Sequence, residues 1–99
     1  MFHTLRWRRD RIEHIAEKHG LTVEEVEEAV FDDPRALVLR GPRSQSRSGS
    51  YVYYVLGRTA AGRYLAVVLL DEGGGVALPV TARNMTAKER RRYERRKQK

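Results

Sequence analysis

The spacing of apolar residues predicts a first helix over residues 10–19. Ile12, Ile15 and Ala16 recur at helical spacing and form one apolar stripe. Gly20 follows at once, and glycine is the residue that most often ends a helix, because it adopts left-handed backbone angles without strain. We therefore expect a short amphipathic helix that stops at Gly20.

A second helix is predicted to begin at Val23. Thr22 and Glu25 form a capping-box pattern, in which each side chain binds the backbone N–H of the other residue. The Asp-Pro pair at residues 33–34 should end this helix, because a proline disfavours helical angles in the residue before it. Its expected apolar face consists of Val23, Val26, Ala29 and Val30.

After the second helix the pattern changes to that of strands. The expected strands are residues 36–40, 51–56, 64–70 and 76–82. Polar loops or turns are expected at 41–50, 58–62 and 72–75. The nearly continuous apolar run 64–70 favours the central strand, and Pro79 places the last strand at an edge or a bulge.

A third helix is predicted from the capping-box pair Thr86 and Glu89 to about residue 97. Ala87 and Tyr93 are its only apolar residues, so it has little to pack with. The expected fold is α+β, in a single domain spanning residues 1–99. It has two N-terminal helices, an antiparallel sheet of three to four strands made by hairpins, and a basic C-terminal helix, with the helices to one side.

The charge distribution points to a polyanionic partner. The formal net charge of the 99 residues is +7, with a pI near 10.2. Residues 21–33 hold six acidic and no basic side chains, whereas residues 83–99 hold nine basic and two acidic ones. RNA, DNA or an acidic protein would suit such a chain. It contains no cysteine and no segment typical of a signal peptide or membrane span, so we expect a cytoplasmic protein without membrane contact.

Among the three histidines, His19 is the candidate for proton transfer, because it lies near the apolar stripe and follows Lys18. The alternative is a histidine at the core edge that only helps to end the helix. His14 points away from the stripe and is expected to be a solvated surface residue. Without cysteine or carboxylates at ligand spacing, the histidines are a weak case for a metal site, and we expect no metal and no cofactor.

Three arginines stand at strand ends: Arg58, Arg63 and Arg83. A guanidinium can bind phosphate through two parallel hydrogen bonds. Arginines at strand ends can also simply protect exposed sheet edges. Hairpin pairing would bring Arg58 and Arg63 to one end of the sheet, whereas the position of Arg83 depends on the register, which the sequence leaves open.

The third helix carries two basic runs, at residues 90–92 and 95–97. They could neutralise several phosphates, form a solvated face or bind an acidic protein. Tyrosines in the strands and Trp7 offer stacking surfaces, although aromatic residues in strands usually belong to the core.

The order and spacing of several short motifs resemble those of a known family. They include Trp7, the Lys-His-Gly at 18–20, the Glu-Glu-Val at 24–26 and the Phe-Asp-Asp-Pro at 31–34. Further motifs follow at residues 56–59, 62–63, 81–83, Thr86, 89–91 and 93–94. In this order the chain resembles the BrnT family, toxins of type II toxin–antitoxin systems with a RelE/ParE-like fold.

This resemblance implies an endoribonuclease that stops translation and is neutralised by a small DNA-binding antitoxin. It implies cleavage without a metal, by attack of the substrate's own 2′-hydroxyl on the adjacent phosphorus. The implied catalytic residues are His19, Arg58 and Arg83. The implied RNA-binding residues are Arg11, Lys18, Arg63, Arg90, Arg91 and Arg95.

The chain departs from the family pattern at Ile15, where asparagine is frequent, at Arg8, where an acidic residue is frequent, and in an insertion at 43–50. Two alternatives from other classes therefore stand beside the ribonuclease. One is a non-catalytic RNA- or DNA-binding module that uses the basic helix, and the other is an interaction protein for an acidic partner. The pattern leaves the oligomeric state open.

Overall fold

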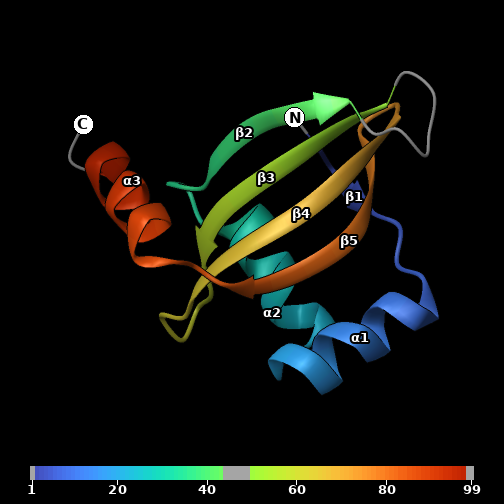
Figure 1. The fold of residues 1–99 in the computed structure, drawn as a ribbon, viewed down its shortest axis with the longest axis horizontal. Helices are drawn as coiled ribbons and strands as arrows, with labels where there is room; N and C mark the ends of the chain where they lie inside the picture. Colours follow the sequence, from blue (N-terminus) through green and yellow to red (C-terminus); the bar gives the residue numbers. More distant parts are fainter. Residues whose placement is uncertain (1, 44–49, 98–99) are drawn as a thin grey trace.

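The structure, a computed structural model, describes residues 2–43 and 50–97 (Figure 1). The helices of this part are α1 (Arg9–His19), α2 (Val23–Glu27), the π-helix η1 (Glu28–Asp32) and α3 (Ala87–Lys97). The strands are β1 (Thr4–Leu5), β2 (Leu37–Arg43), β3 (Tyr51–Arg58), β4 (Tyr64–Gly73) and β5 (Val76–Asn84). None of the helices described is long and apolar enough to cross a membrane.

The strands form one sheet in the order β1-β5-β4-β3-β2. Strands β2 to β5 pair as antiparallel hairpins, and β4 is central as predicted. The expectation of three to four antiparallel strands is wrong, because β1 adds a fifth strand parallel to β5 and makes the sheet mixed. Two residues are too few to show a strand's alternating pattern, so the sequence gives no sign of β1.

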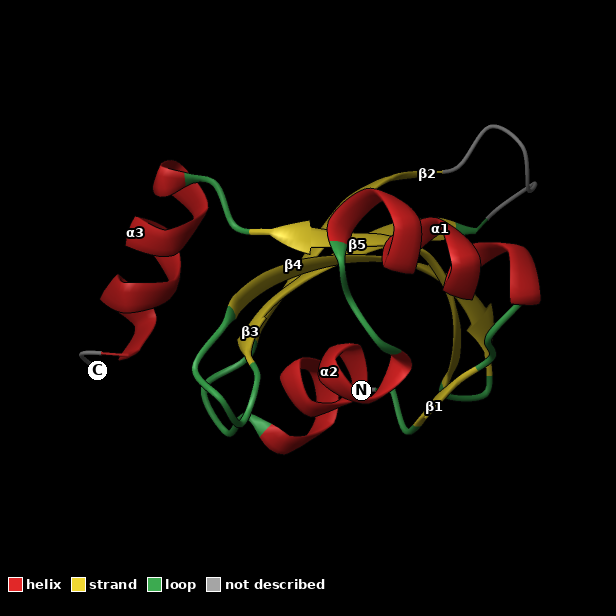
Figure 2. Ribbon diagram, turned by 90° about the horizontal axis from the view of Figure 1, so that it is seen from below, coloured by secondary structure: helices red, strands yellow, loops and turns green. Residues whose placement is uncertain are grey.

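Helices cover both faces of the sheet, not one side as expected (Figure 2). The sheet curves around α2, and α1 packs mainly against β5. On the opposite face, α3 contributes Tyr93, which is only 1% exposed and clusters with Leu56 and Ala66. A single large aromatic ring thus attaches a helix that has almost no other apolar residue.

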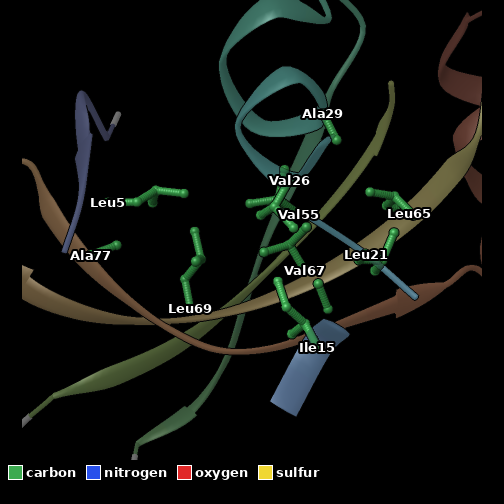
Figure 3. Packing of buried hydrophobic residues seen from close by; sticks show 11 residues of the cluster. Leu5, Ile15, Leu21, Val26, Ala29, Val55, Leu65, Val67, Leu69 and Ala77 are labelled. Atoms are coloured by element: carbon green, nitrogen blue, oxygen red, sulfur yellow. The ribbon is translucent and has the colours of Figure 1, made fainter. Parts of the chain in front are cut away.

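The main core lies between the sheet and the first two helices (Figure 3). It joins Ile15, Leu21 and Val26 of the helical layer to alternate residues of the central strands, such as Val55 and Val67. Burial of these side chains fixes the positions of the end of α1 and of β5, which border the site described below.

The helix ends follow the predicted signals. Gly20 has a φ of 64° and ends α1, and Thr22 and Glu25 form the expected capping box. Thr86 and Glu89 form the second box, with Glu89 N donating to Thr86 Oγ1 at 3.1 Å and Thr86 N to Glu89 Oε1 at 2.8 Å. Strand β2 continues to Arg43, so the loop expected from residue 41 begins later; its residues 44–49 lie outside the described part.

A bulge in β5 determines where its functional side chains stand. Thr81 pairs with Val68 and Pro79 with Leu69, so one extra residue is inserted between them. Pro79, which has no N–H to donate, lies beside this bulge, as predicted. Beyond the bulge, Arg83 lies opposite Ala66 and on the same face of the sheet as Thr81.

The apolar stripe predicted for α1 is only partly correct. Ile15 is buried, but Ile12 is 36% exposed and Ala16 is also exposed. The more protected polar residues are Arg11, His14 and His19. The helix packs along β5 through this mixed surface, which periodicity of apolar residues alone does not reveal.

Candidate functional site

Two imidazoles lie together where α1 packs against β5. The ring centroids of His14 and His19 are 5.7 Å apart, with the planes at 72°. His14 Nε2 is 3.1 Å from Thr81 Oγ1 of β5. The expectation that His14 is a solvated surface residue is therefore wrong, since the packing of α1 on β5 turns this ring toward the strand.

The surroundings of His19 favour its neutral form. Partial removal from water lowers the pKa of His19, and the positive charges of His14, Lys18 and Arg83 lower it further. A neutral imidazole at physiological pH has a free lone pair and can accept a proton. By lowering its pKa, these groups favour the form of His19 that can act as a general base.

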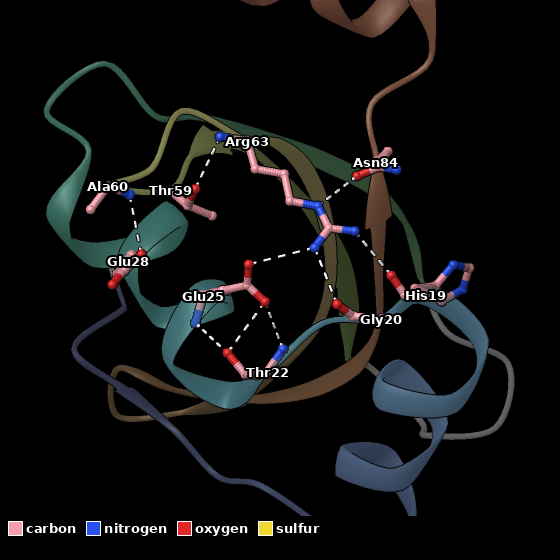
Figure 4. A network of polar contacts seen from close by, with 9 residues as sticks. All are labelled: His19, Gly20, Thr22, Glu25, Glu28, Thr59, Ala60, Arg63 and Asn84. Atoms are coloured by element: carbon pink, nitrogen blue, oxygen red, sulfur yellow. Dashed lines mark hydrogen bonds and ion pairs between the residues drawn. The ribbon is translucent and has the colours of Figure 1, made fainter.

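Arg63 holds the end of α1 that carries His19 (Figure 4). Its Nη2 donates to the backbone oxygen of His19 and its Nη1 to that of Gly20, both at 3.1 Å, while Nε donates to Asn84 Oδ1 at 3.1 Å. Nη1 also lies 3.5 Å from Glu25 Oε2. The His19 ring points away from this network, so Arg63 orients the backbone and leaves the imidazole accessible.

Arg83 is clamped at the start of α3. Its Nη1 and Nη2 donate to the two carboxylate oxygens of Glu89 at 2.7 and 2.9 Å, and Nη1 also donates to the backbone oxygen of Asn84 at 3.2 Å. This pairing raises the pKa of Arg83 and lowers that of Glu89 to about 2. Glu89 therefore has two roles, as the cap of α3 and as the anchor of Arg83.

The clamp leaves one edge of the guanidinium of Arg83 open. Glu89 and Asn84 accept hydrogen bonds from the Nη1–Nη2 edge, whereas the single hydrogen of Nε and the second hydrogen of Nη2 make none of these hydrogen bonds. An Nε–Nη2 edge can bind two oxygens of one phosphate. Arg83 and His19 thus combine an oriented anion-binding group with a neutral imidazole.

Arg58, the third predicted catalytic residue, is placed in a different environment. Its guanidinium stacks over Tyr64, with Cζ 4.7 Å from the ring centroid, and its buried Nε has no hydrogen-bond partner. It lines a pocket of about 440 Å³ together with Asp33 and Tyr93. Asp33 accepts hydrogen bonds from the backbone N–H of Arg58 at 2.9 Å and from the hydroxyl of Tyr93 at 2.7 Å. None of these contacts joins Arg58 to His19 or Arg83.

Most of the other predicted RNA-binding residues are exposed. Lys18 is exposed, and Arg11 is half-buried with its Nε 3.9 Å from Asp10 Oδ2. On α3, Arg91 and Arg95 are exposed. Arg90 lies over the Tyr64 ring, with Cζ 4.0 Å from the centroid. Of these side chains, Lys18 lies near enough for its charge to lower the pKa of His19.

Trp7 serves as an anchor for the N-terminal segment. Its Nε1 donates to Glu27 Oε2 at 3.0 Å, and its ring packs against the main core. Within residues 2–43 and 50–97, no three potential metal ligands of the His, Cys, Asp or Glu type cluster together.

Sequence reasoning missed His14, Thr81 and the anchoring role of Glu89. The pairing of Glu89 with Arg83 had a weak signal, because the capping box places Glu89 only six residues after Arg83. The contact of His14 with Thr81 had none, because it depends on the bulge in β5 and on the side of the sheet along which α1 packs.

The described residues form a small α+β domain in which a histidine with a lowered pKa lies within reach of the charge of an arginine held by a carboxylate. Residues 7–89 match the family model described as "Ribonuclease toxin, BrnT, of type II toxin-antitoxin system". The chain therefore belongs to the BrnT family of ribonuclease toxins.

The fold supports this assignment. The crystal structure of the Brucella abortus ribonuclease toxin BrnT matches with a TM-score of 0.57, over 84% of this chain and 96% of that one. The sequence identity is 14%, so the likeness concerns the fold. A comparison with curated protein sequences found no match.

Proposed function

We propose that this protein is a toxin that cleaves RNA without a metal ion and so inhibits translation in the cytoplasm, on a scaffold of the RelE/ParE type. The observation that carries the proposal is a His19 imidazole whose pKa is lowered by partial removal from water and by nearby positive charges, among them Arg83, which Glu89 holds in place. The family match adds the reaction class.

In the proposed reaction, His19 accepts the proton of a ribose 2′-hydroxyl. The 2′-oxygen then attacks the adjacent phosphorus and displaces the 5′-oxygen of the next nucleotide, which leaves a 2′,3′-cyclic phosphate. The open Nε–Nη2 edge of Arg83 binds the non-bridging phosphate oxygens, whose negative charge grows in the transition state. Lys18 adds positive charge beside His19.

Arg63 acts in this scheme as a positioning residue, because its donors hold the carbonyls at the end of α1. Arg11, Arg90, Arg91 and Arg95 contact the RNA backbone on either side of the cleaved bond. Their contribution is sequence-independent and falls with rising salt. Arg58 is proposed to bind a phosphate farther along the RNA, beside the pocket that Arg58 lines.

The proposed protein partner is a small DNA-binding antitoxin. Two surfaces of opposite charge are available to it. One comprises Glu24, Asp32 and their acidic neighbours on α2 and η1, and the other is the basic face of α3 with Arg91 and Arg95. Charge complementarity would steer association at either surface.

The test separates cleavage from binding. Purified His19→Gln and Arg83→Ala proteins are compared with wild type on one labelled RNA, by gel for cleavage and by anisotropy for binding. Arg6→Ala is the matched control for Arg83→Ala. Arg6 lies outside the site and also forms a bidentate salt bridge, with both contacts to Glu72 at 2.7 Å. We expect both site variants to lose at least about 100-fold in cleavage rate.

The control should cleave like wild type. If both site variants also cleave like wild type, His19 and Arg83 are not the site. If wild type binds the RNA but does not cleave it, free or on ribosomes, the protein is a binding module that uses α3.

A further inference from the structure

His14 lies in the site but has no role in the reaction proposed for His19 and Arg83. It lies beside His19 and is tethered through Nε2 to Thr81 Oγ1 at 3.1 Å. Both rings are half-buried, so a substrate on this surface can reach them. Besides His14, the charged groups that act on His19 are Lys18 of α1 and Arg83 of β5, the latter bound to Glu89 of α3.

RNA cleavage by a 2′-hydroxyl needs two proton transfers. One group takes the proton of the attacking hydroxyl, and another protonates the leaving 5′-oxygen, which would otherwise depart as a strongly basic alkoxide. His19 in its neutral form can do only the first in a given turnover. Arg83 cannot supply the second proton, since a guanidinium does not deprotonate in proteins.

We propose that His14 is the general acid of this protein and forms an acid–base pair with His19. This inference rests on the proposed ribonuclease function. Ring centroids 5.7 Å apart allow one nitrogen of each ring to approach a different oxygen of the same phosphate, at hydrogen-bond distances of about 3 Å. The hydrogen bond to Thr81 fixes the orientation of the His14 ring.

The proton balance of the proposed step is complete. The 2′-O–H bond breaks and its proton goes to the His19 imidazole, while a bond forms between the 2′-oxygen and phosphorus. The bond between phosphorus and the 5′-oxygen breaks, and that oxygen takes a proton from His14. In protonated His14, Nε2–H donates to Thr81 Oγ1 and Nδ1–H supplies the transferred proton.

The mutual electrostatics of the two rings support this division of roles. The charge of His14 lowers the pKa of His19, so double protonation of the pair is disfavoured. A state with one charged and one neutral ring is the state that the reaction needs.

The experiment compares two oligonucleotides that differ at the leaving atom. One has an ordinary 5′-oxygen after a single ribonucleotide, and the other has sulfur in its place. A thiolate leaves without protonation, because it is a far weaker base than an alkoxide. Wild type, His14→Gln and His19→Gln are assayed on both, with His3→Gln as the matched control, because His3 lies at the other end of β5, bonded to Gly74.

We expect His14→Gln to slow cleavage of the oxygen substrate by about 10²- to 10⁴-fold. It should cleave the sulfur substrate within about tenfold of wild type, whereas His19→Gln should fail on both. Glutamine can still bond Thr81, and thermal melts establish that each variant is folded. Thr81→Val keeps both imidazoles, and its smaller loss on the oxygen substrate should also disappear with sulfur.

Three other results count against the inference. If His14→Gln cleaves the oxygen substrate like wild type, His14 has no part in the reaction, while the proposed function stands. If it loses equally on both substrates, His14 is a positioning residue and not the acid. If wild type cleaves neither substrate, free or on ribosomes, the proposed function fails and the acid–base pair with it.

Discussion

Replacing Glu89 by glutamine tests how firmly Arg83 is clamped. Glutamine has nearly the same shape, and its oxygen can still accept the N–H of Thr86, so the helix cap is kept. What is lost is the charge that Arg83 binds at 2.7 and 2.9 Å. The variant therefore isolates the ion pair from the capping box.

The depressed pKa of Glu89 gives the size of the effect. A fall from 4.5 to about 2 corresponds to roughly 3 kcal/mol of stabilisation of the charged form. The side chain of Arg83 is 34% exposed, so solvent screening reduces this figure to about 2 kcal/mol. A carboxyl group with a lowered folded-state pKa stabilises the fold above its unfolded pKa. This contribution is lost as the pH falls through the folded value.

Urea unfolding of wild type and Glu89→Gln between pH 7 and pH 3 measures this directly. We expect a difference of about 2 kcal/mol at pH 7 that begins to shrink below about pH 4.5 and has fallen by more than half at pH 3. Glu72→Gln is the control, because its partner Arg6 is more exposed, and it should cost less stability than Glu89→Gln. If wild type and Glu89→Gln are equally stable at pH 7, or if their difference is as large at pH 3 as at pH 7, the ion pair of Glu89 with Arg83 does not stabilise the fold.

Three further variants test other contacts. Gly57→Ala should destabilise the protein by about 3 kcal/mol or more in urea unfolding, because the new Cβ would collide with the backbone oxygen of Ala29. A loss below about 1 kcal/mol would contradict the close packing of η1 on β3. Tyr93→Phe removes a buried hydroxyl that donates a hydrogen bond to Asp33, so the free energy of unfolding should fall by about 1.5–2 kcal/mol while the cleavage rate stays near that of wild type. A loss of activity without a loss of stability would contradict a structural role for Tyr93. Arg63→Gln removes both the charge and the fork, so stability should fall by about 1–2 kcal/mol, because the hydrogen bonds to the end of α1 are lost. The salt dependence of RNA binding should be unchanged, and a smaller salt slope would make Arg63 a phosphate ligand.

Local signals in the sequence predicted most of the secondary structure. The capping boxes at Thr22 and Thr86, the glycine after α1 and the proline beside the bulge all act within a few residues, so their effect is visible in the sequence. Strand β1 lacked such a signal, because it consists of two residues that pair only when β5 is already in place.

The candidate site was predictable only in part. His19 and Arg83 were predicted as site residues, and in the structure the charge of Arg83 helps to lower the pKa of His19. Their catalytic roles stay a prediction. The roles of Arg63 and His14 were not foreseen, because both depend on where the end of α1 rests against the sheet. Arg58 looked equivalent to Arg83 in the sequence, since both follow a strand, yet its contacts are with Tyr64 and Asp33.

The central claim is that His19 and Arg83 cut RNA through its own 2′-hydroxyl. The most direct measurement is the chemistry of the new ends when purified wild-type protein cleaves a defined RNA in EDTA, analysed by mass spectrometry. We expect a 2′,3′-cyclic phosphate on one fragment and a 5′-hydroxyl on the other. A 3′-hydroxyl paired with a 5′-phosphate, or cleavage that stops in EDTA and returns with a divalent cation, would contradict the mechanism.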